Sequence, residues 1–475
     1  MRNVTARIFS DEFSCDGIEV IRVVGREQIS RPYEFEVDLV LRDANASVAA
    51  QMLGSSAELG FSVEGAVERV FQGMISWVRE SLDPVSALRT CRVRLVPILN
   101  RLAQVSLQAV FTGSIPKIVA EKLSACEIAY ELRLSGTYPD RDYVAQFAET
   151  DLAFVCRLCE HLGISYFFEG DSGAERVIFT DDNRFGEGPT PLVIPFRMRG
   201  ETMDVYKLDV ALTLTPSLYV VTDYNYRSPQ VSIVGRAENP EGTGGGIVEY
   251  GVHTKTPEEA DTLARLRGEE LECRREQLLG ESDRVELGAG VAFTLQDLPF
   301  LVEPSLLVTA VEHRIEQAAM GAADGALAYS NQFRAISSKK PYRPERLTPV
   351  PKIAGFRGGI VVAQRGTDGT SPWLDEVGRY HIQLFFDTLE TGGAEPAARA
   401  MRMIQAHAGA DYGMHFPLRP GTEVMVGFVN GDIDRPVIVG AVPNPLTLSP
   451  VTAEAALHSR IRTASGVTVE FEDGF

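Results

Sequence analysis

Apolar and polar residues alternate with a period of two along much of the first 110 residues. In the stretch RPYEFEVDLV, Tyr33, Phe35 and Val37 alternate with acidic neighbours. This period puts successive side chains on opposite faces of a strand, so each run fits a sheet with one apolar and one hydrated face. Six such runs are VTARIFS, IEVIRVVG, YEFEVDLVLR, AELGFSV, VERVFQGMISWVRE and LRTCRVRLVPIL. They predict a first β-barrel or sandwich over residues 1–111.

Helical spacing replaces this alternation after residue 111. In SIPKIVAEKLSA, Ser114 is a suitable N-cap, and apolar residues recur every three or four positions. In ETDLAFVCRLCEHLG, Thr150 is a candidate cap and Gly163 a candidate stop. Two apolar runs, ISYFFEG and ERVIFTDD, follow as a predicted hairpin. We therefore expect an α/β insert over residues 112–200.

Strand patterns return over residues 201–337, which we expect to form a second barrel, and one strongly marked helix interrupts them. Thr256 is followed by Pro257 and, three residues after the threonine, by Glu259. This is the arrangement of an N-cap, a first-turn proline and a capping box, and it predicts a helix over residues 256–279.

The stretch SSKKPYRPERLTPVPKIAG contains four prolines. Proline fixes φ and has no amide donor, so residues 338–354 are predicted to form an extended linker at a domain boundary.

Five short apolar runs occupy residues 355–446: GGIVVAQ, GRYHIQLFFD, AMRMIQA, TEVMVGFVN and RPVIVGAV. Five strands at this spacing are typical of a small closed barrel of the OB type, because closure removes exposed sheet edges. Between the last two runs, Asn430, Gly431, Asp432 and Asp434 favour a tight turn, and Pro436 suits the start of an edge strand.

Charge narrows the functional classes. The 475-residue chain has 65 acidic and 46 basic residues, a net charge of −19. Residues 355–445 carry ten acidic residues against seven arginines. Proteins that hold phosphate backbones need clustered lysine and arginine, so nucleic acid is not an expected partner.

The N-terminus lacks a basic region followed by an apolar one, and no run of about 18 apolar residues occurs later, so we expect neither a signal peptide nor a membrane span. The six cysteines are too sparse for a disulfide framework and are expected to be free thiols.

Standard catalytic signatures are missing. The sequence contains no GxSxG elbow, no GxxxxGK[ST] loop and no HExxH helix. We therefore predict no catalytic, cofactor-binding or metal-binding residues, and no cofactor.

Four weaker patterns have both a functional and a structural interpretation. Cys156 and Cys159 form a CxxC near His161. This pattern could belong to a metal or redox site, but packing of the two cysteines in the core is the preferred interpretation. Asp181 and Asn183 have the spacing of a calcium loop but lack its later ligands, which favours a solvated turn.

The third pattern, GTGGGIV at residues 242–248, departs from GxGxxG and favours a flexible loop over a phosphate cradle. In the fourth, His407 and His415 flank a glycine-containing loop without an evident third ligand. We expect that loop to pack against the barrel rather than to bind metal.

Several motifs in register resemble one known family. DEVGRYHIQLFFD, AGADYGMHFPLRPGTEVMVGFVNGDIDRPVIVGAVPN and RIRTASGVTVEFED are similar to the OB region of VgrG (valine-glycine repeat) spike proteins of type VI secretion and related contractile injection systems. RPYEFEVDLV, FQGMISWVRE, YVAQFAETDLAFVCRLCEHLGISYFFEG, VVTDYNYRSP and FRAISSKKPYRP resemble the hub region in the same order. That family is itself similar to the hub and spike of contractile phage tails.

The resemblance implies a mainly β protein with an α/β insert: two barrel-like hub domains, an OB-fold neck and a trimeric β-helix needle. It implies a homotrimer whose pseudo-sixfold ring sits on a hexameric tube protein (Hcp-like). Other implied partners are baseplate proteins, a PAAR-like tip protein, effectors and the target membrane. Such a protein assembles in the cytoplasm and is then injected without a signal peptide.

Two departures qualify the resemblance. The lysozyme domain that follows the OB barrel in the phage counterpart is not matched, so a muramidase role is not carried over. Residues 447–475 would be only the start of the needle, apparently truncated. We predict a non-enzymatic spike; the alternatives are a cell-wall hydrolase component that uses paired carboxylates, and an OB-type module that binds nucleic acid or carbohydrate.

Overall fold

The computed structural model describes most of the chain. The described residues are 3–41, 48–82, 89–171, 174–183, 185, 192–197, 203–298, 304–317, 328–364, 366, 368–388 and 398–472. Their contacts divide the chain into two compact units. Unit 1 comprises Met1–Val105, Ile115–Tyr138 and Asp151–Pro349, and unit 2 comprises Ser106–Ser114, Pro139–Thr150 and Val350–Phe475. The chain therefore passes from one unit to the other five times.

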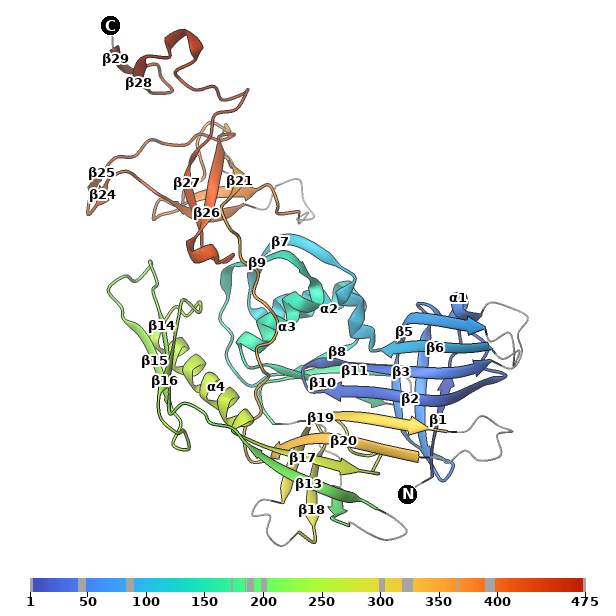
Figure 1. Ribbon diagram of the computed structural model, residues 1–475. Helices are drawn as coiled ribbons and strands as arrows, with labels where there is room; N and C mark the ends of the chain where they lie inside the picture. Colours follow the sequence, from blue (N-terminus) through green and yellow to red (C-terminus); the bar gives the residue numbers. More distant parts are fainter. Residues whose placement is uncertain are drawn as a thin grey trace. The chain divides into compact units, whose positions relative to one another are not determined.

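A twelve-stranded sheet is the largest sheet in the described part of unit 1 (Figure 1). Its first six strands are β1 (Val4–Phe9), β2 (Ile18–Gln28), β3 (Arg31–Leu41), β4 (Ser56–Val63), β5 (Ala66–Leu82) and β6 (Arg89–Val96). They lie in the order β1-β4-β5-β6-β3-β2, and the short helix α1 (Val48–Met52) precedes β4. All six strands predicted in this region are confirmed.

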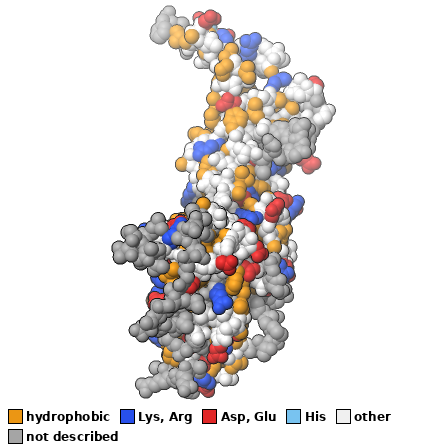
Figure 2. All heavy atoms as spheres, turned by 90° about the vertical axis from the view of Figure 1, so that its right-hand side faces the viewer, with side chains coloured by type: hydrophobic (Ala, Val, Ile, Leu, Met, Phe, Trp, Pro, Cys, Tyr) orange, Lys and Arg blue, Asp and Glu red, His pale blue; other side chains and the backbone are white. Residues whose placement is uncertain are grey.

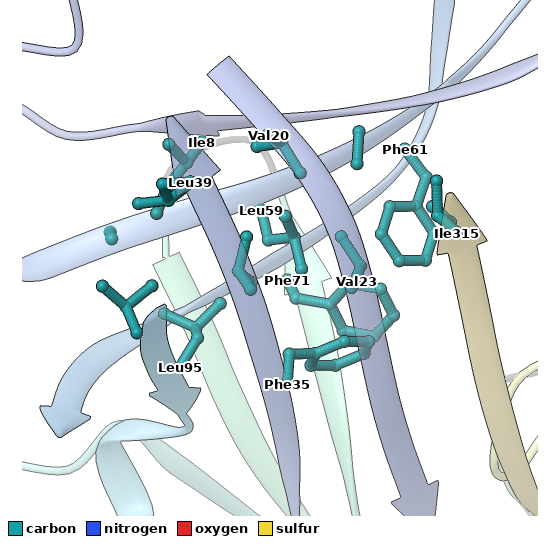
Figure 3. Close-up of a cluster of buried hydrophobic side chains, with 14 of the residues drawn as sticks. Ile8, Val20, Val23, Phe35, Leu39, Leu59, Phe61, Phe71, Leu95 and Ile315 are labelled. Carbon is teal, nitrogen blue, oxygen red and sulfur yellow. The ribbon is translucent and has the colours of Figure 1, made fainter. Parts of the chain in front are cut away.

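The six N-terminal strands curl around one apolar core. Phe35, Phe61 and Phe71 come from β3, β4 and β5 and meet beside Val23 of β2 (Figure 3). Ile315 completes this group from a strand nearly 300 residues away in sequence. The inward residues are those that the period of two predicts.

A side chain closes the seam between β1 and β2. The Gln317 side-chain amide accepts a hydrogen bond from the Ala6 amide at 3.0 Å and donates one to the Ala6 carbonyl at 3.1 Å. It also donates to the Val20 carbonyl, and the Gln317 backbone amide donates to Ile21 at 2.9 Å. This amide satisfies β1 backbone groups that would otherwise face outward as an open sheet edge.

The second half of the sheet forms a similar curl. Its strands are β12 (Leu192–Pro195), β13 (Val205–Leu212), β17 (Glu276–Ser282), β18 (Ala292–Gln296), β19 (Ser305–Glu316) and β20 (Ala328–Ser337). The Arg197 amide donates to the Val205 carbonyl at 2.8 Å and so links the end of β12 to the start of β13. Antiparallel pairing of β2 with β19 joins the two curls into one sheet.

The two curls share a cross-strand device. Gly25 of β2 lies opposite Phe35 of β3, and a Cβ on Gly25 would lie 1.9 Å from that ring. Gly280 of β17 lies opposite Phe333 of β20, and its Cβ would lie 2.2 Å from that ring. In each curl the phenyl ring occupies the space above a glycine, which covers a position that would otherwise weaken the strand.

The insert region packs two helices near a small sheet. Its elements in unit 1 are the 3₁₀ helix η1 (Ile98–Ala103), α2 (Ile115–Ala125), α3 (Asp151–His161), β8 (Tyr130–Arg133), β10 (Ser165–Asp171) and β11 (Ala174–Thr180). The predicted hairpin of β10 and β11 is confirmed, and both predicted helices are present. A buried ion pair between Lys122 and Asp151 at 2.9 Å ties α2 to α3.

The helix α4 (Pro257–Arg275) covers one face of a three-stranded sheet of β14 (Leu218–Asp223), β15 (Ile233–Glu238) and β16 (Gly246–Tyr250) (Figure 1). Thr256 caps it by accepting from the Glu259 amide at 3.2 Å. The Glu259 carboxylate accepts a hydrogen bond at 3.1 Å from the backbone amide of Lys255, the residue before the cap.

The predicted end of this helix at residue 279 is wrong. β17 begins at Glu276, and the buried Leu278 belongs to the core of the second curl. Tertiary packing therefore overrides the helical pattern here.

The proline-rich segment opens with a turn at residues 338–340 and has neither helix nor strand over residues 341–351; its first part is bound along its length within unit 1. Arg343 pairs with Glu269 of α4 at 2.6 Å, and Arg274 of α4 pairs with Glu345 at 2.9 Å. The Thr348 hydroxyl donates to Glu160 of α3 at 2.8 Å. Residues 338–349 thus form a strap across α4 and α3.

Unit 2 contains the predicted closed barrel. Its strands are β21 (Phe356–Val361), β22 (Tyr380–Leu384), β23 (Arg399–Met403), β26 (Glu423–Phe428) and β27 (Pro436–Ala441), in the closed order β21-β22-β23-β27-β26. The opening of the tight turn is η2 (Val429–Gly431), where Asn430 has φ 58°. The last two barrel strands are those predicted from residues 421–444.

Two further strands complete the barrel unit. β7 (Ser106–Gly113) and β9 (Arg141–Thr150) pair with each other, and their buried Val110 and Ala145 belong to the core of the barrel. The Ala145 amide donates to Asp434 at 2.6 Å. β9, from the predicted 112–200 insert, and β7, which lies mostly in the predicted first barrel over residues 1–111, therefore serve unit 2.

The remaining elements of unit 2 lie outside the barrel wall. β24 (Ala408–Gly409) pairs with β25 (Tyr412–Gly413), η3 (Ala453–Ala455) follows the barrel, and β28 (His458–Arg462) pairs with β29 (Thr468–Glu472). The last pair lies where the start of a needle was predicted.

Candidate functional site

The CxxC thiols are part of the core. Cys156 and Cys159 are buried on α3 as free cysteines. Burial raises the pKa of Cys156 to about 11 and also raises that of Cys159, so both remain protonated at neutral pH. The Arg267 guanidinium contacts His161 Nδ1 at 3.2 Å and donates to the His161 carbonyl at 3.1 Å. The preferred interpretation as core packing is confirmed.

Asp181 and Asn183, the two residues with the spacing of a calcium loop, hold a turn and the strap in place. Asp181 accepts from the amides of Ser135 and Gly136 and from the Tyr138 hydroxyl. Burial opposes ionisation of Asp181, but these hydrogen bonds outweigh it and lower the pKa. Asn183 accepts from the Tyr342 amide at 2.7 Å. Both side chains therefore have structural partners; positions 184 and 186–188 of the motif lie outside the described residues.

The glycine-rich stretch leads into strand β16, not into a helix, so it does not have the architecture of a phosphate-binding loop. Gly244 and Gly245 adopt positive φ, as a loop requires.

The loop that carries His407 and His415 agrees with the prediction only in part. Its residues 406–417 are exposed, and the loop lies against the barrel only where the His415 ring stacks on Tyr380 of β22. His415 contacts the Tyr380 hydroxyl at 3.2 Å and Gln405 at 3.1 Å, while the His407 ring lies against Tyr412. The two histidines therefore have separate partners.

A buried polar cluster in unit 1 was not predicted. Glu27 of β2 accepts from Arg69 of β5 at 2.6 Å and from His313 Nε2 of β19 at 2.8 Å. His313 Nδ1 then accepts from the Tyr329 hydroxyl at 2.9 Å, whose oxygen accepts from Asn331. The chain of donors is complete when His313 is neutral and Glu27 is ionised.

The pKa shifts agree with that assignment. Burial lowers the pKa of His313 despite the opposing effect of Glu27. Burial alone would raise the pKa of Glu27, but Arg69 and His313 hold it below its ordinary value. The cluster resembles a catalytic relay, but Glu27, His313 and Tyr329 are buried between strands, and only Arg69 is partly exposed. The cluster joins strands of both curls instead.

A second, partly buried carboxyl connects the small sheet to the large one. The Tyr33 hydroxyl contacts both the Glu175 carboxyl of β11 and the Gln72 carbonyl of β5. Burial raises the pKa of Glu175 to about 8, against the lowering effects of Tyr33 and the Ile98 amide. A protonated Glu175 donates to the Tyr33 oxygen and leaves the Tyr33 hydrogen for Gln72.

In the described part of unit 2, one hairpin carries exposed apolar side chains on one face. In the β28–β29 hairpin, Ile461 lies opposite Val469, and Phe471 follows on the same face; all three are exposed. The other face pairs Arg460 with Glu470 at 2.7 Å. Figure 2 shows apolar and charged side chains together at the upper end, where this hairpin lies.

Isolated two-stranded hairpins are marginal in water, and clustered exposed apolar groups mark interaction surfaces. The arrangement is therefore suited to assembly and not to catalysis. Among the described helices, none is long and apolar enough to cross a membrane.

A model of the phage tail baseplate hub (GPD) family matches residues 26–319, more than half of the chain. The chain belongs to this family of baseplate hubs. A second model, the type VI secretion system/phage-baseplate injector OB domain, matches residues 374–442, within the closed barrel region. The hub match precedes the OB-domain match along the chain, which is the order in which the sequence motifs resemble the hub and OB regions.

Curated relatives support the same family. The chain is 26% identical over 466 residues to the type VI secretion system spike protein VgrG1b of Pseudomonas aeruginosa, covering 94% of this chain and 62% of the relative. It is also 26% identical to the actin cross-linking toxin VgrG1 of Vibrio cholerae, covering 93% of this chain and 41% of that protein. The chain thus spans less than two thirds of these relatives.

The fold matches a solved structure of the E. coli c3393 protein, a type VI secretion component described as similar to the T4 tail proteins gp27 and gp5. The TM-score is 0.65 at 22% identity, covering 92% of this chain and all of the other. The resemblance to VgrG spike proteins is thereby confirmed, as is the mainly β hub fold with an OB domain.

Proposed function

We propose that this baseplate hub acts as a non-enzymatic, homotrimeric spike of a contractile injection system, of the type VI secretion kind. The observation that carries the proposal is that a hub region and an injector OB barrel follow each other in one chain. The uncovered apolar face of the β28–β29 hairpin supports assembly, because three copies would bury what one copy exposes. In this proposal the hairpin begins a trimeric β-helix.

The oligomeric state tests the proposal. Light scattering on the purified chain should give three times the chain mass of 52.0 kDa. A stable monomer at micromolar concentration would contradict a trimeric spike.

The proposed partners follow from the same role. A threefold ring built from two similar curls per copy fits a hexameric, Hcp-like tube protein, and baseplate proteins hold the ring during assembly. The needle end carries a PAAR-like tip protein and effectors and punctures the target membrane. The protein is assembled in the cytoplasm and then injected with the tube. Co-purification with the tube protein, lost when the hub region is deleted, tests the first contact.

The enzymatic alternative is tested separately. A cell-wall hydrolase needs two accessible carboxyls about 5 to 10 Å apart, one of them with a raised pKa. Glu175 has a raised pKa, but its carboxyl contacts the hydroxyl of the buried Tyr33. We expect no release of peptidoglycan fragments by the purified chain, and turnover abolished by a single carboxylate substitution would restore the alternative. A steep fall of oligonucleotide binding with salt would favour the binding-module alternative.

A further inference from the structure

A hollow lies on the outer face of the twelve-stranded sheet, which is the face turned away from the apolar cores of the two curls. Six neighbouring strands line it, in the order β3-β2-β19-β20-β17-β13 (Figure 1). Its volume is about 670 Å³, within the range of ligand-binding sites. The residues that line it all belong to unit 1, so the hollow exists within a single copy of the chain.

Strand pairing places six outward side chains next to one another at the centre of the hollow. Gln28 of β2 lies opposite Ala310 of β19, which lies opposite Arg334 of β20. Arg334 in turn lies opposite Leu279 of β17. The adjacent cross-strand pair of β19 and β20 completes the set. We call these six residues the outer groove: Gln28, Leu279, Ala310, Glu312, Gln332 and Arg334.

The charges at the two ends of the hollow are paired with each other. Arg26 of β2 lies 4.0 Å from Glu34 of β3, and Lys207 of β13 lies 2.9 Å from Glu281 of β17. In the outer groove between them, the polar side chains are exposed or half-buried, and none has a hydrogen bond or ion pair to another described residue. The groove therefore offers a ligand one guanidinium, one carboxylate and two side-chain amides.

These groups match the chemistry of a polypeptide. The side-chain amides of Gln28 and Gln332 offer donors and acceptors, as a peptide group does. The Arg334 guanidinium matches a carboxylate, with which it can form two parallel hydrogen bonds. Ala310 and Leu279, on either side of Arg334, provide an apolar floor. Six strands span roughly 24 Å, which is the length of about seven extended residues.

Other polymers fit the hollow less well. Four basic and five acidic residues line it, so it does not attract a polyanion such as nucleic acid. The aromatic residues among those that line it, Tyr33 and Phe333, are buried. The described lining therefore offers no aromatic face on which a base or a sugar ring could stack.

We propose that the outer groove binds an extended polypeptide segment of a partner protein. A carboxylate of the segment lies on Arg334, and its peptide groups bond to Gln28 and Gln332. Glu312 repels a second carboxylate next to the first, so the segment carries an isolated acidic residue. The site needs no neighbouring copy and does not rest on the proposed trimer.

Heptapeptide arrays test the groove on the purified full chain. In the first array every peptide is uncharged except for one glutamate at its centre, and in the second array glutamine replaces that glutamate. The tightest binders of the first array should lose at least about tenfold in affinity on this replacement, because a hydrogen-bonded charge pair is lost. Arg334→Gln should cause the same loss with the glutamate peptides and no loss with the glutamine peptides.

Arg314→Gln is the matched control. Arg314 is also an exposed arginine on the outer side of β19, but it does not line the hollow. This variant should bind the glutamate peptides as the parent chain does. Both substitutions are at exposed positions, so circular dichroism and light scattering should match the parent chain.

Several results would overturn the proposal. They are binding no tighter than millimolar, equal affinity for glutamate and glutamine peptides, and an equal loss of affinity in the two variants. A change in the mass of Arg334→Gln in light scattering would mean that another copy of the chain occupies the groove. Binding of heparin or of a chitin oligosaccharide that Arg334→Gln removes, without peptide binding, would assign the groove to a different class of ligand.

A crosslink decides the matter if Arg334→Gln does not fold. The tightest glutamate peptide, carrying a photoreactive residue, is irradiated with the parent chain. Crosslinks on β2, β19 or β20 support the groove, and crosslinks confined to other elements overturn it. A monomeric parent chain that binds the glutamate peptides as described contradicts the proposed trimer and supports the groove.

Discussion

Polar residues at inward strand positions hold unit 1 together. Glu27 follows Val23 and Gly25 on the buried side of β2, and His313 lies between Val311 and Ile315 on the buried side of β19. In each strand an ionisable residue takes a position where the period-two pattern expects an apolar one. The sequence alone therefore marks Glu27 and His313 as unusual. The partners are not predictable, because Glu27 and His313 are 286 residues apart and meet only through the pairing of β2 with β19.

Glu175 leads to a pH prediction. Its pKa rises from 4.5 to about 8 on folding, so the folded chain binds one more proton than the unfolded chain between these values. Stability should therefore be greatest below pH 4.5 for this group and fall as pH rises to 8, with a slope approaching about 1.4 kcal/mol per pH unit.

Denaturant unfolding from pH 5 to pH 8 measures this slope, and Glu175→Gln, which imitates the protonated carboxyl, should remove it. The matched change Glu68→Gln, at an exposed position of β5, should leave the slope unchanged. Equal slopes for the parent and Glu175→Gln would show that Glu175 is ionised in the fold.

Strands were the elements best predicted from sequence. Period-two alternation located β1 to β6 and the five barrel strands, because one buried face imposes the pattern directly. Two things were missed for tertiary reasons: helix α4 ends early because Leu278 is needed in a core, and β7 and β9 serve the barrel of unit 2. Each depends on a partner far away in sequence.

The strap illustrates the same limit. Its prolines predict extended backbone, and residues 341–349 contain neither helix nor strand, after a turn at residues 338–340. Their attachment was not predictable, because it depends on ion pairs such as Arg343 with Glu269, 74 residues apart. A proline-rich composition alone does not distinguish a free linker from a bound one.

The pairing of Gly280 on β17 with Phe333 on β20 leads to a prediction about the stability of these strands. Gly280→Ala would place a Cβ against the Phe333 ring and should destabilise the fold by about 1 to 3 kcal/mol through overpacking. Adding Phe333→Leu should recover part of that loss, since the smaller side chain frees the space. Thermal and denaturant unfolding measure both effects.

Gly60→Ala on β4 is the control, because its Cβ would approach only the Phe9 ring, at 3.4 Å. It should be close to neutral. A Gly280→Ala variant as stable as the Gly60→Ala variant would mean that the ring does not depend on the glycine.

At the scale of the whole molecule, the five passages between units make the OB barrel dependent on distant sequence. A fragment starting at Val350 lacks Val110 and Ala145 of the barrel core, and leaves Asp434 without the Ala145 amide. Burial of one valine side chain contributes about 1.5 to 3 kcal/mol, so this fragment should be unstable.

Joining residues 106–114 and 139–150 through a short glycine–serine loop to residues 350–475 should restore a cooperative melt. Circular dichroism on heating compares the two fragments. Identical melting temperatures would mean that the barrel folds without β7 and β9.

The side-chain seam at Gln317 has a further consequence. One amide imitates a peptide group and occupies places on Ala6 that a neighbouring strand would otherwise take. A short extended peptide added in trans would offer the same donor and acceptor several times over. Such a peptide would compete for β1, and the first barrel would thereby offer an entry point for inhibitors that work by strand insertion.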